Sequence, residues 1–220
     1  MVTVIYFWRI PSRRFLFALW RMARDPRIIR AFPGIHFAKV LGCGKGETFT
    51  PLDADLHRWG VLFTIDGASL ENFDNSKIVR GWRERSTHEF RILLDPISSH
   101  GQWSKQEPFN SSVRPSQNGQ VVAITRARIA WKQNIKFWKA VPTVTKSLHN
   151  SPGLIAAIGI GEAPIGLQGT FSLWESADAL RDFAYKGAAH REAIEATARN
   201  NWYSEELFAR FAVRDVRGSL

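Results

Sequence analysis

His190 is the side chain whose type and setting best fit metal chemistry in this sequence. It lies near the start of a predicted helix, residues 188–199, and shares a helix face with Ile194 and Thr197, because positions four and seven residues apart lie on one side. A neutral imidazole beside apolar side chains suits axial ligation of haem iron. The alternative is a histidine at a helix start that has no ligand role.

An internal repeat also singles out this position. The tripeptide Pro33–Ile35 reappears 119 residues later as Pro152–Leu154, and further along the chain the offset becomes 110. At the second offset Arg80 corresponds to His190. Core residues should persist between two copies, so a change of functional group marks a place where the copies have divided roles. Arg80 is therefore a candidate catalytic residue, which would face the mirror cavity or pair with a haem propionate.

Glu162 is a second candidate catalytic residue, and it follows the apolar run 154–160. A carboxylate at such a strand end can point into a cavity or hydrogen-bond the backbone of the turn, and the sequence favours the backbone role. The single cysteine, Cys43, excludes an internal disulfide and any multi-cysteine metal site. We expect it to be a small buried residue beside a turn.

The elements that must position these residues occur in the same order in each copy: strand, helix, two strands, helix, strand. In the first copy they are 3–9, 12–24, 35–41, 59–66, a helix capped by Ser69, and 89–97; in the second they are 121–129, 132–147, 154–160, 169–175, a helix capped by Ser176, and 207–213. This is the ferredoxin-like order, whose sheet has one face covered by helices and one face bare. Packing two such sheets together buries both bare faces. The sequence therefore predicts an α+β fold in which tandem ferredoxin-like repeats form a pseudo-twofold dimeric α+β barrel.

The predicted domain organisation has two repeats joined by a linker. The first repeat covers residues 1–103 and the second 120–220, which carries the haem-site candidate; the segment 104–119 between them is rich in Ser, Pro, Asn and Gln. The change of offset falls in one connection, an extra loop at 45–58 in the first copy that the second copy shortens to about 162–168.

The chain is basic, with a formal net charge of +10, and arginines crowd its first thirty residues, where Asp25 is the only acid. A basic helix with interleaved aromatic residues is typical of a membrane-surface element, or of an amphipathic helix that packs on a core and solvates its arginines. Nucleic-acid binding is not expected, because zinc-finger and RNA-recognition signatures are absent. No apolar stretch is long enough to span a bilayer and no signal peptide is visible. We therefore expect a cytoplasmic protein, with a peripheral membrane contact through the basic first helix as the alternative.

Several motifs in the second copy are long and specific. They are Pro152–Leu154, Gly159–Pro164, Thr170–Trp174, Phe183–Tyr185, His190–Glu192 and Trp202–Phe211, and the segment Pro33–Gly42 adds a similar motif in the first copy. Together they resemble the spheroidene monooxygenase family, which contains carotenoid ketolases of phototrophic bacteria. The resemblance covers nearly the whole chain.

The resemblance implies an O2-dependent monooxygenase that uses haem b, inserts oxygen into a small apolar polyene and takes electrons from a ferredoxin-type donor. It implies His190 as the iron ligand, with Tyr185, Arg191 and Trp202, from the same motifs, as cofactor contacts. The alternatives are a different haem enzyme on the same barrel (a dehydratase, a peroxidase or an enzyme of nitrogen–oxygen chemistry) or a non-catalytic protein that binds haem or an apolar ligand. A homo-oligomer is a further possible arrangement.

Overall fold

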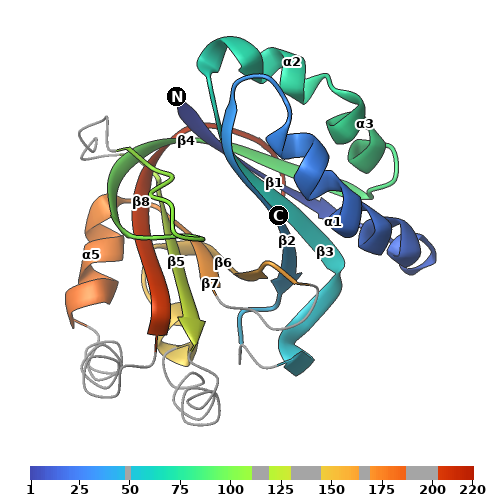
Figure 1. The fold of residues 1–220 in the computed structure, drawn as a ribbon. Coiled ribbons are helices and arrows are strands. Elements are labelled where there is room, and N and C mark those ends of the chain that lie inside the picture. Colours follow the sequence, from blue (N-terminus) through green and yellow to red (C-terminus); the bar gives the residue numbers. More distant parts are fainter. Residues whose placement is uncertain (48–50, 111–118, 130–144, 164–168, 187–202) are drawn as a thin grey trace.

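The computed structural model describes residues 1–47, 51–110, 119–129, 145–163, 169–186 and 203–220 of the chain. Within these residues, eight antiparallel strands close into a barrel in the order β1-β3-β2-β6-β7-β5-β8-β4 (Figure 1). The strands are β1 (Val2–Arg9), β2 (Ile35–Gly44), β3 (Ala54–Ile65), β4 (His88–Gly101), β5 (Val121–Ile129), β6 (Leu154–Gly161), β7 (Gly169–Trp174) and β8 (Tyr203–Gly218). Closure leaves no free sheet edge among them.

The helices lie outside the barrel, in two groups. Helices α1 (Phe15–Arg30), α2 (Leu70–Asp74) and α3 (Lys77–Arg83) cover the first copy, whereas α5 (Ala177–Lys186) covers the second (Figure 1). In the described part of the chain no helix is both long and apolar enough to cross a membrane.

Strand register confirms the repeat residue by residue. Val2 pairs with Ile65 in the first copy, and their counterparts Val121 and Trp174 pair in the second. Even an irregularity is repeated: the register of β2 on β3 shifts between Ile35 and Phe37, and that of β6 on β7 shifts between Leu154 and Ala156. The two copies thus share one backbone design, and the predicted fold class is confirmed.

The two halves meet through their own counterparts. Gly42 of β2 pairs with Gly161 of β6, which lies 119 residues later. On the other side of the barrel Asp95 of β4 pairs with Ala212 of β8, 117 residues later. A pair of equivalent residues that face each other marks a twofold axis, so a pseudo-twofold axis passes through both junctions.

The Pro-Gly turns show why the repeat keeps its glycines. Gly34 has φ +82° and Gly153 has φ +77°, values that residues other than glycine rarely adopt. A Cβ on Gly34 would lie 2.5 Å from the Oγ of Ser69, and one on Gly153 would lie 2.6 Å from the Cβ of Ala179. Ser69 and Ala179 are themselves related by the predicted offset of 110, so both turns pack on the same place in the following helix.

Several predicted boundaries were wrong. Helix α1 continues through Pro26 to Arg30, because buried Ile29 and the Arg21–Asp25 pair hold its last turns on the sheet. The predicted extra loop 45–58 includes the start of β3, and β8 extends well beyond 207–213 on both sides. The side chain of Ser69 makes no capping hydrogen bond.

Helix caps do form at two other serines. Ser76 Oγ accepts a bond from the N–H of Val79 at the start of α3, and Ser176, the predicted cap of the second copy, accepts one from the N–H of Ala179 at 3.1 Å. The predicted helix 132–147 lies mostly outside the described residues.

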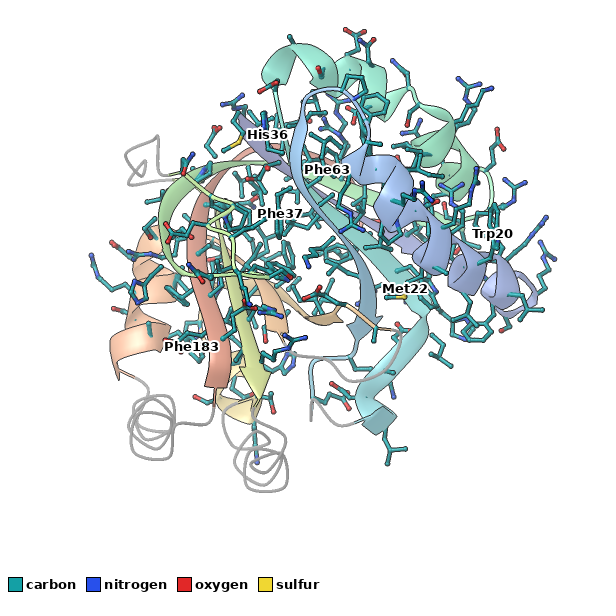
Figure 2. All side chains as sticks on the ribbon, viewed as in Figure 1. Trp20, Met22, His36, Phe37, Phe63 and Phe183 are labelled. Carbon is teal, nitrogen blue, oxygen red and sulfur yellow. The ribbon has the colours of Figure 1, made fainter. Side chains whose placement is uncertain are left out.

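Alternation along each strand produces separate apolar layers. Inward side chains fill the barrel, where Phe37 lies near the centre (Figure 2). Outward side chains of the first copy pack under α1–α3 and include Phe63, whereas the described outward side chains of the second copy form a layer under α5, against which Phe183 of α5 packs. The barrel interior is therefore a packed core, and each copy packs a further apolar layer under its helices.

Candidate functional site

One end of the barrel holds a charged cluster centred on Glu162, which follows β6. Its carboxylate accepts hydrogen bonds from Lys39 Nζ at 2.5 Å, from the indole N–H of Trp103 at 2.7 Å and from Arg126 at 3.0 Å. The described partners of its carboxylate are side chains from β2, β5 and the segment after β4, whereas the turn 164–168, to which the predicted backbone role refers, lies outside the described residues.

Glu205, near the start of β8, completes the cluster from the other side. It forms an ion pair with Arg126 and accepts hydrogen bonds from the backbone N–H groups of Ser104 at 3.1 Å and Lys105 at 2.8 Å. Ser104 and Lys105 have φ values of 55° and 60°, a conformation that costs free energy in residues other than glycine. The two glutamates thus fasten the chain that leaves β4 across this end of the barrel.

The segment that follows β4 places two aromatic side chains, Trp103 and Phe109, in the barrel core. Trp103 is buried and packs edge-on against Phe37, while Phe109 packs against Phe211 with ring centroids 4.9 Å apart. Phe109, which lies in the predicted linker, therefore contributes to the barrel core.

Burial raises the pKa of Glu162, but hydrogen bonds from Lys39 and Trp103 and the charges of Lys39 and Arg126 outweigh burial and hold that pKa below its usual value. Burial likewise raises the pKa of Glu205, and the N–H groups of Lys105 and Ser104 together with Arg126 lower it further than burial raises it. Both carboxylates are ionised at neutral pH. Glu162 is therefore suited to hold neighbouring groups in place rather than to donate a proton.

The sequence interpretation missed Lys39, Trp103, Arg126 and Glu205. A signal for two of them was present in the repeat. Lys39 and Arg126 stand at inward positions of their strands, where the other copy has Ile158 and Phe7. A cation that replaces an apolar inward residue needs a buried partner, and that requirement points to a charged cluster.

A second candidate site lies between the strands and helices of the second copy, and the first copy shows what normally fills this layer. There Tyr6 stacks on Trp8 with centroids 5.0 Å apart, and Trp8 stacks on Trp82 of α3 at 5.2 Å. Phe63 adds a further ring above Tyr6, at 6.4 Å. All four rings are fully or nearly fully buried, so this layer of the first copy is solid protein.

In the second copy the equivalent strand positions carry small residues. By strand register Tyr6 corresponds to Thr125, Trp8 to Ala127 and Phe63 to Ser172. At these three strand positions the second copy therefore has no aromatic ring. Trp174 stands where the first copy has Ile65, and its buried indole donates to the hydroxyl of Ser172 at 2.9 Å.

A cavity of about 280 Å³ lies in this region, between α5 and the outward side chains of β4 and β8. Its lining combines apolar and polar groups: Ser98, Ser99, His100, Leu180, Arg181, Ala184, Phe208 and Arg210. Arg210 donates to the hydroxyl of Ser98 at 3.0 Å, and Phe208 pairs across the strands with Thr125. The cavity therefore adjoins the surface where aromatic residues have been replaced by small ones.

The remaining predicted site residues have the following positions. Arg80 lies on the exposed side of α3 and donates to the backbone carbonyl of Asn75 at 3.3 Å, so the structure brings it neither to Glu162 nor to the cavity under α5. Tyr185 lies on α5, but its side chain is outside the described part, as are His190, Arg191 and Trp202 altogether. Among described residues, no group of three His, Cys, Asp or Glu side chains could hold a metal ion.

Cys43 is buried, as the sequence predicted. Burial raises the pKa of its thiol far above the usual value, so the thiol is protonated at neutral pH. A protonated thiol inside the barrel is unsuited to ligate a metal.

Solved structures share this barrel. An aldoxime dehydratase matches with a TM-score of 0.62 at 11% identity, covering 97% of this chain and 81% of that chain. An aldoxime dehydratase in complex with butyraldoxime matches with a TM-score of 0.57 at 10% identity, covering 97% and 79%. At these identities the likeness concerns the fold, which is an α+β barrel of tandem ferredoxin-like repeats.

Sequence relatives define the family more closely, although no protein-family model matches the chain. Proteins named spheroidene monooxygenase are 32% identical in Rhodobacter capsulatus (90% of this chain, 84% of the relative) and 35% in Rubrivivax gelatinosus (84% and 72%). A third, in Cereibacter sphaeroides, is 31% identical over 92% of this chain, which spans only 63% of that relative's length. The chain belongs to the spheroidene monooxygenase family.

Proposed function

We propose that this protein is a haem-dependent monooxygenase that acts on an apolar, carotenoid-like polyene. The family supports the reaction and the substrate class, because three relatives carry the name spheroidene monooxygenase. The observation that carries the cofactor proposal is the difference between the two helix-facing layers. Three buried rings of the first copy are replaced by Thr125, Ala127 and Ser172 in the second.

The residues that line the cavity under α5 suit a large planar group with carboxylate edges. Phe208 and Leu180 offer apolar surface, while Arg181 and Arg210 offer guanidinium groups that pair well with propionates. His190 is proposed to hold the haem iron, and Tyr185, Arg191 and Trp202 are proposed cofactor contacts from the family motifs.

When bound, haem would supply O2 activation, which places one oxygen atom in the substrate and releases the other as water with two electrons and two protons from outside. The chain would contribute binding, orientation and exclusion of water. The residues of α5, β4 and β8 that line the cavity would hold the bound group. Electrons would come from a ferredoxin-type donor, which the basic surface would attract if the donor is acidic.

In this proposal Glu162 is a positioning residue. Its bonds to Trp103 and Arg126 hold the segment after β4 against the barrel end. Arg80, the counterpart of His190, stays a proposed catalytic residue of the first copy, where its exposed guanidinium would be open to a haem propionate; in the described part of the chain its side chain donates to the carbonyl group of Asn75.

An absorption spectrum tests the cofactor assignment. The protein is purified, reconstituted with haem and compared with His190→Ala and with His100→Ala, which changes the histidine that lines the described cavity. We expect a Soret band in the wild type and in His100→Ala, and its loss or shift in His190→Ala. Loss of the Soret band in His100→Ala alone would identify His100 as the ligand. The absence of any haem band in the wild type would reject the cofactor.

Oxygen dependence tests the reaction. A carotenoid substrate is incubated with the reconstituted protein, a ferredoxin and its reductase, under isotopically labelled O2 and in parallel without O2. We expect labelled product only when O2 is present. Turnover without O2 would favour the alternative function, a dehydratase. The barrel of this chain has the fold of the aldoxime dehydratase structures. Stoichiometric haem binding without any product would indicate a carrier.

A further inference from the structure

The outer face of α1 is a continuous stripe of exposed apolar and basic side chains. It consists of Arg13, Leu16, Trp20, Arg24 and Arg27, which follow one another at intervals of three or four residues and therefore share one side of the helix. Arg13 lies in the short 3₁₀ turn that leads into α1, and the other four lie in the helix. We call this stripe the α1 outer face.

Its two apolar members are unusually open to solvent. Leu16 is 77% exposed and Trp20 is 52% exposed. Trp20 lies on the outer side of the helix, away from the barrel, and the guanidinium of Arg24 lies 4.7 Å from its ring centroid (Figure 2). Met22, by contrast, faces the sheet and is buried. The core-facing side of α1 is thus already occupied, and Leu16 and Trp20 do not contribute to it.

The charges on this face have no acidic counterpart. Asp25, the only acid of α1, is buried on the opposite side, where Arg21 donates to it at 2.5 Å and the indole of Trp82 at 2.9 Å. Within the described residues Arg13 and Arg27 form no ion pair and no side-chain hydrogen bond. The α1 outer face therefore presents a net positive charge around exposed apolar groups.

We infer that the α1 outer face docks this protein onto the surface of an anionic lipid bilayer. A tryptophan combines an apolar ring with an N–H donor and is therefore suited to the level of the headgroups, and a leucine one turn away adds apolar area. Arginines on the same stripe pair with lipid phosphates and are drawn to the negative surface potential of anionic membranes.

The combination of exposed apolar side chains and arginines on the α1 outer face distinguishes a membrane from other anionic partners. A phosphate backbone or an acidic protein would use the arginines but gives no reason for Leu16 to be more than three-quarters exposed. Helix α1 and helix α5 cover different parts of the barrel (Figure 1), and no residue of the α1 outer face lines the cavity under α5. Docking therefore goes beyond the proposed oxygen chemistry and can be tested without it.

Co-sedimentation with lipid vesicles tests the inference on the purified full chain. Vesicles of phosphatidylcholine alone are compared with vesicles that also contain phosphatidylglycerol. We expect binding to the anionic vesicles only, with partition falling as salt is raised. Leu16→Ser with Trp20→Ser should abolish it, and Arg24→Gln with Arg27→Gln should lower the partition coefficient by roughly fivefold per arginine removed.

Matched controls change the same kinds of residue elsewhere. Lys77→Gln with Lys146→Gln removes two exposed cations, and Ile155→Ser with Val216→Ser removes two exposed apolar side chains, in each case away from α1. Both double variants should bind vesicles as the wild type does. Circular dichroism checks that every variant is folded, and bromine-labelled lipid should quench less fluorescence in Trp20→Phe than in the wild type.

Three results would overturn the inference. The first is equal binding by the wild type and Leu16→Ser/Trp20→Ser. The second is a loss of binding in both controls as large as in the α1 variants, because the effect would then be one of total charge or exposed apolar area. The third is wild-type self-association in sedimentation velocity that the Leu16/Trp20 variant abolishes, without vesicle binding by either protein, which would assign the face to a second copy of the chain.

Discussion

Trp103 donates its indole N–H to the carboxylate of Glu162 at 2.7 Å, across 59 residues of sequence and the junction between the two copies. The same carboxylate is held by Lys39 of the first copy and Arg126 of the second. Residues from both copies therefore share one polar centre at this end of the barrel, and several consequences can be measured.

Glu162→Gln should lower the free energy of unfolding by about 2 kcal/mol, because it leaves the buried Arg126 and the largely buried Lys39 with less counter-charge. The figure is below that for a fully buried ion pair since Glu162 is partly open to solvent. Urea unfolding measures the change. Glu84→Gln, which removes an exposed ion pair with Arg85, should change it by less than about 0.5 kcal/mol. Equal effects would show that the cluster contributes no more than a surface pair.

Stability should depend on pH in the acid range through Glu162 and Glu205. Both pKa values are lower in the folded protein than the ordinary 4.5, so the unfolded chain takes up protons first. Their contribution is complete above pH 4.5 and is lost as the pH falls through the lower folded values. Thermal melts between neutral pH and pH 3 measure this slope. It should flatten in Glu162→Gln/Glu205→Gln, and an unchanged slope would place the acid sensitivity elsewhere.

Thr125→Phe should abolish haem binding while the barrel stays folded. The ring would restore, next to Phe208, the filling that Tyr6 provides in the first copy. Thr125→Val keeps the size of the side chain and should bind haem as the wild type does. The readout is haem stoichiometry by absorption titration, with circular dichroism as a check on folding. Full haem binding by Thr125→Phe would contradict a cofactor in the layer under α5.

Gly153→Ala should destabilise the protein by about 2 kcal/mol, because the new Cβ would sit 2.6 Å from Ala179 at a residue with φ +77°. Adding Ala179→Gly removes the collision but leaves the backbone strain, so it should recover only part of the loss. Chemical denaturation of the three proteins separates the two effects. Complete recovery in the double variant would mean that the backbone conformation costs nothing.

The repeat made much of the fold predictable. Pro33–Ile35 and Pro152–Leu154 have the same roles in both copies, and strand positions such as 121–129 agree with the structure because alternation and turn residues are local signals. Boundaries failed where tertiary contacts overrode local preference. Helix α1 crosses Pro26 because Ile29 and Asp25 are held from outside the helix.

The candidate sites were likewise predictable only in part from the sequence. Sequence alone identified the two copies, their element order, the family motifs and Glu162 as a residue to examine. It could not join Glu162 to Lys39, Trp103 and Arg126, since these contacts bridge 123, 59 and 36 residues and depend on barrel closure. The meaning of Thr125, Ala127 and Ser172 also came only from the tertiary structure. That these small residues replace aromatic rings is visible only from strand register, which shows that Tyr6, Trp8 and Phe63 occupy the equivalent positions in the first copy.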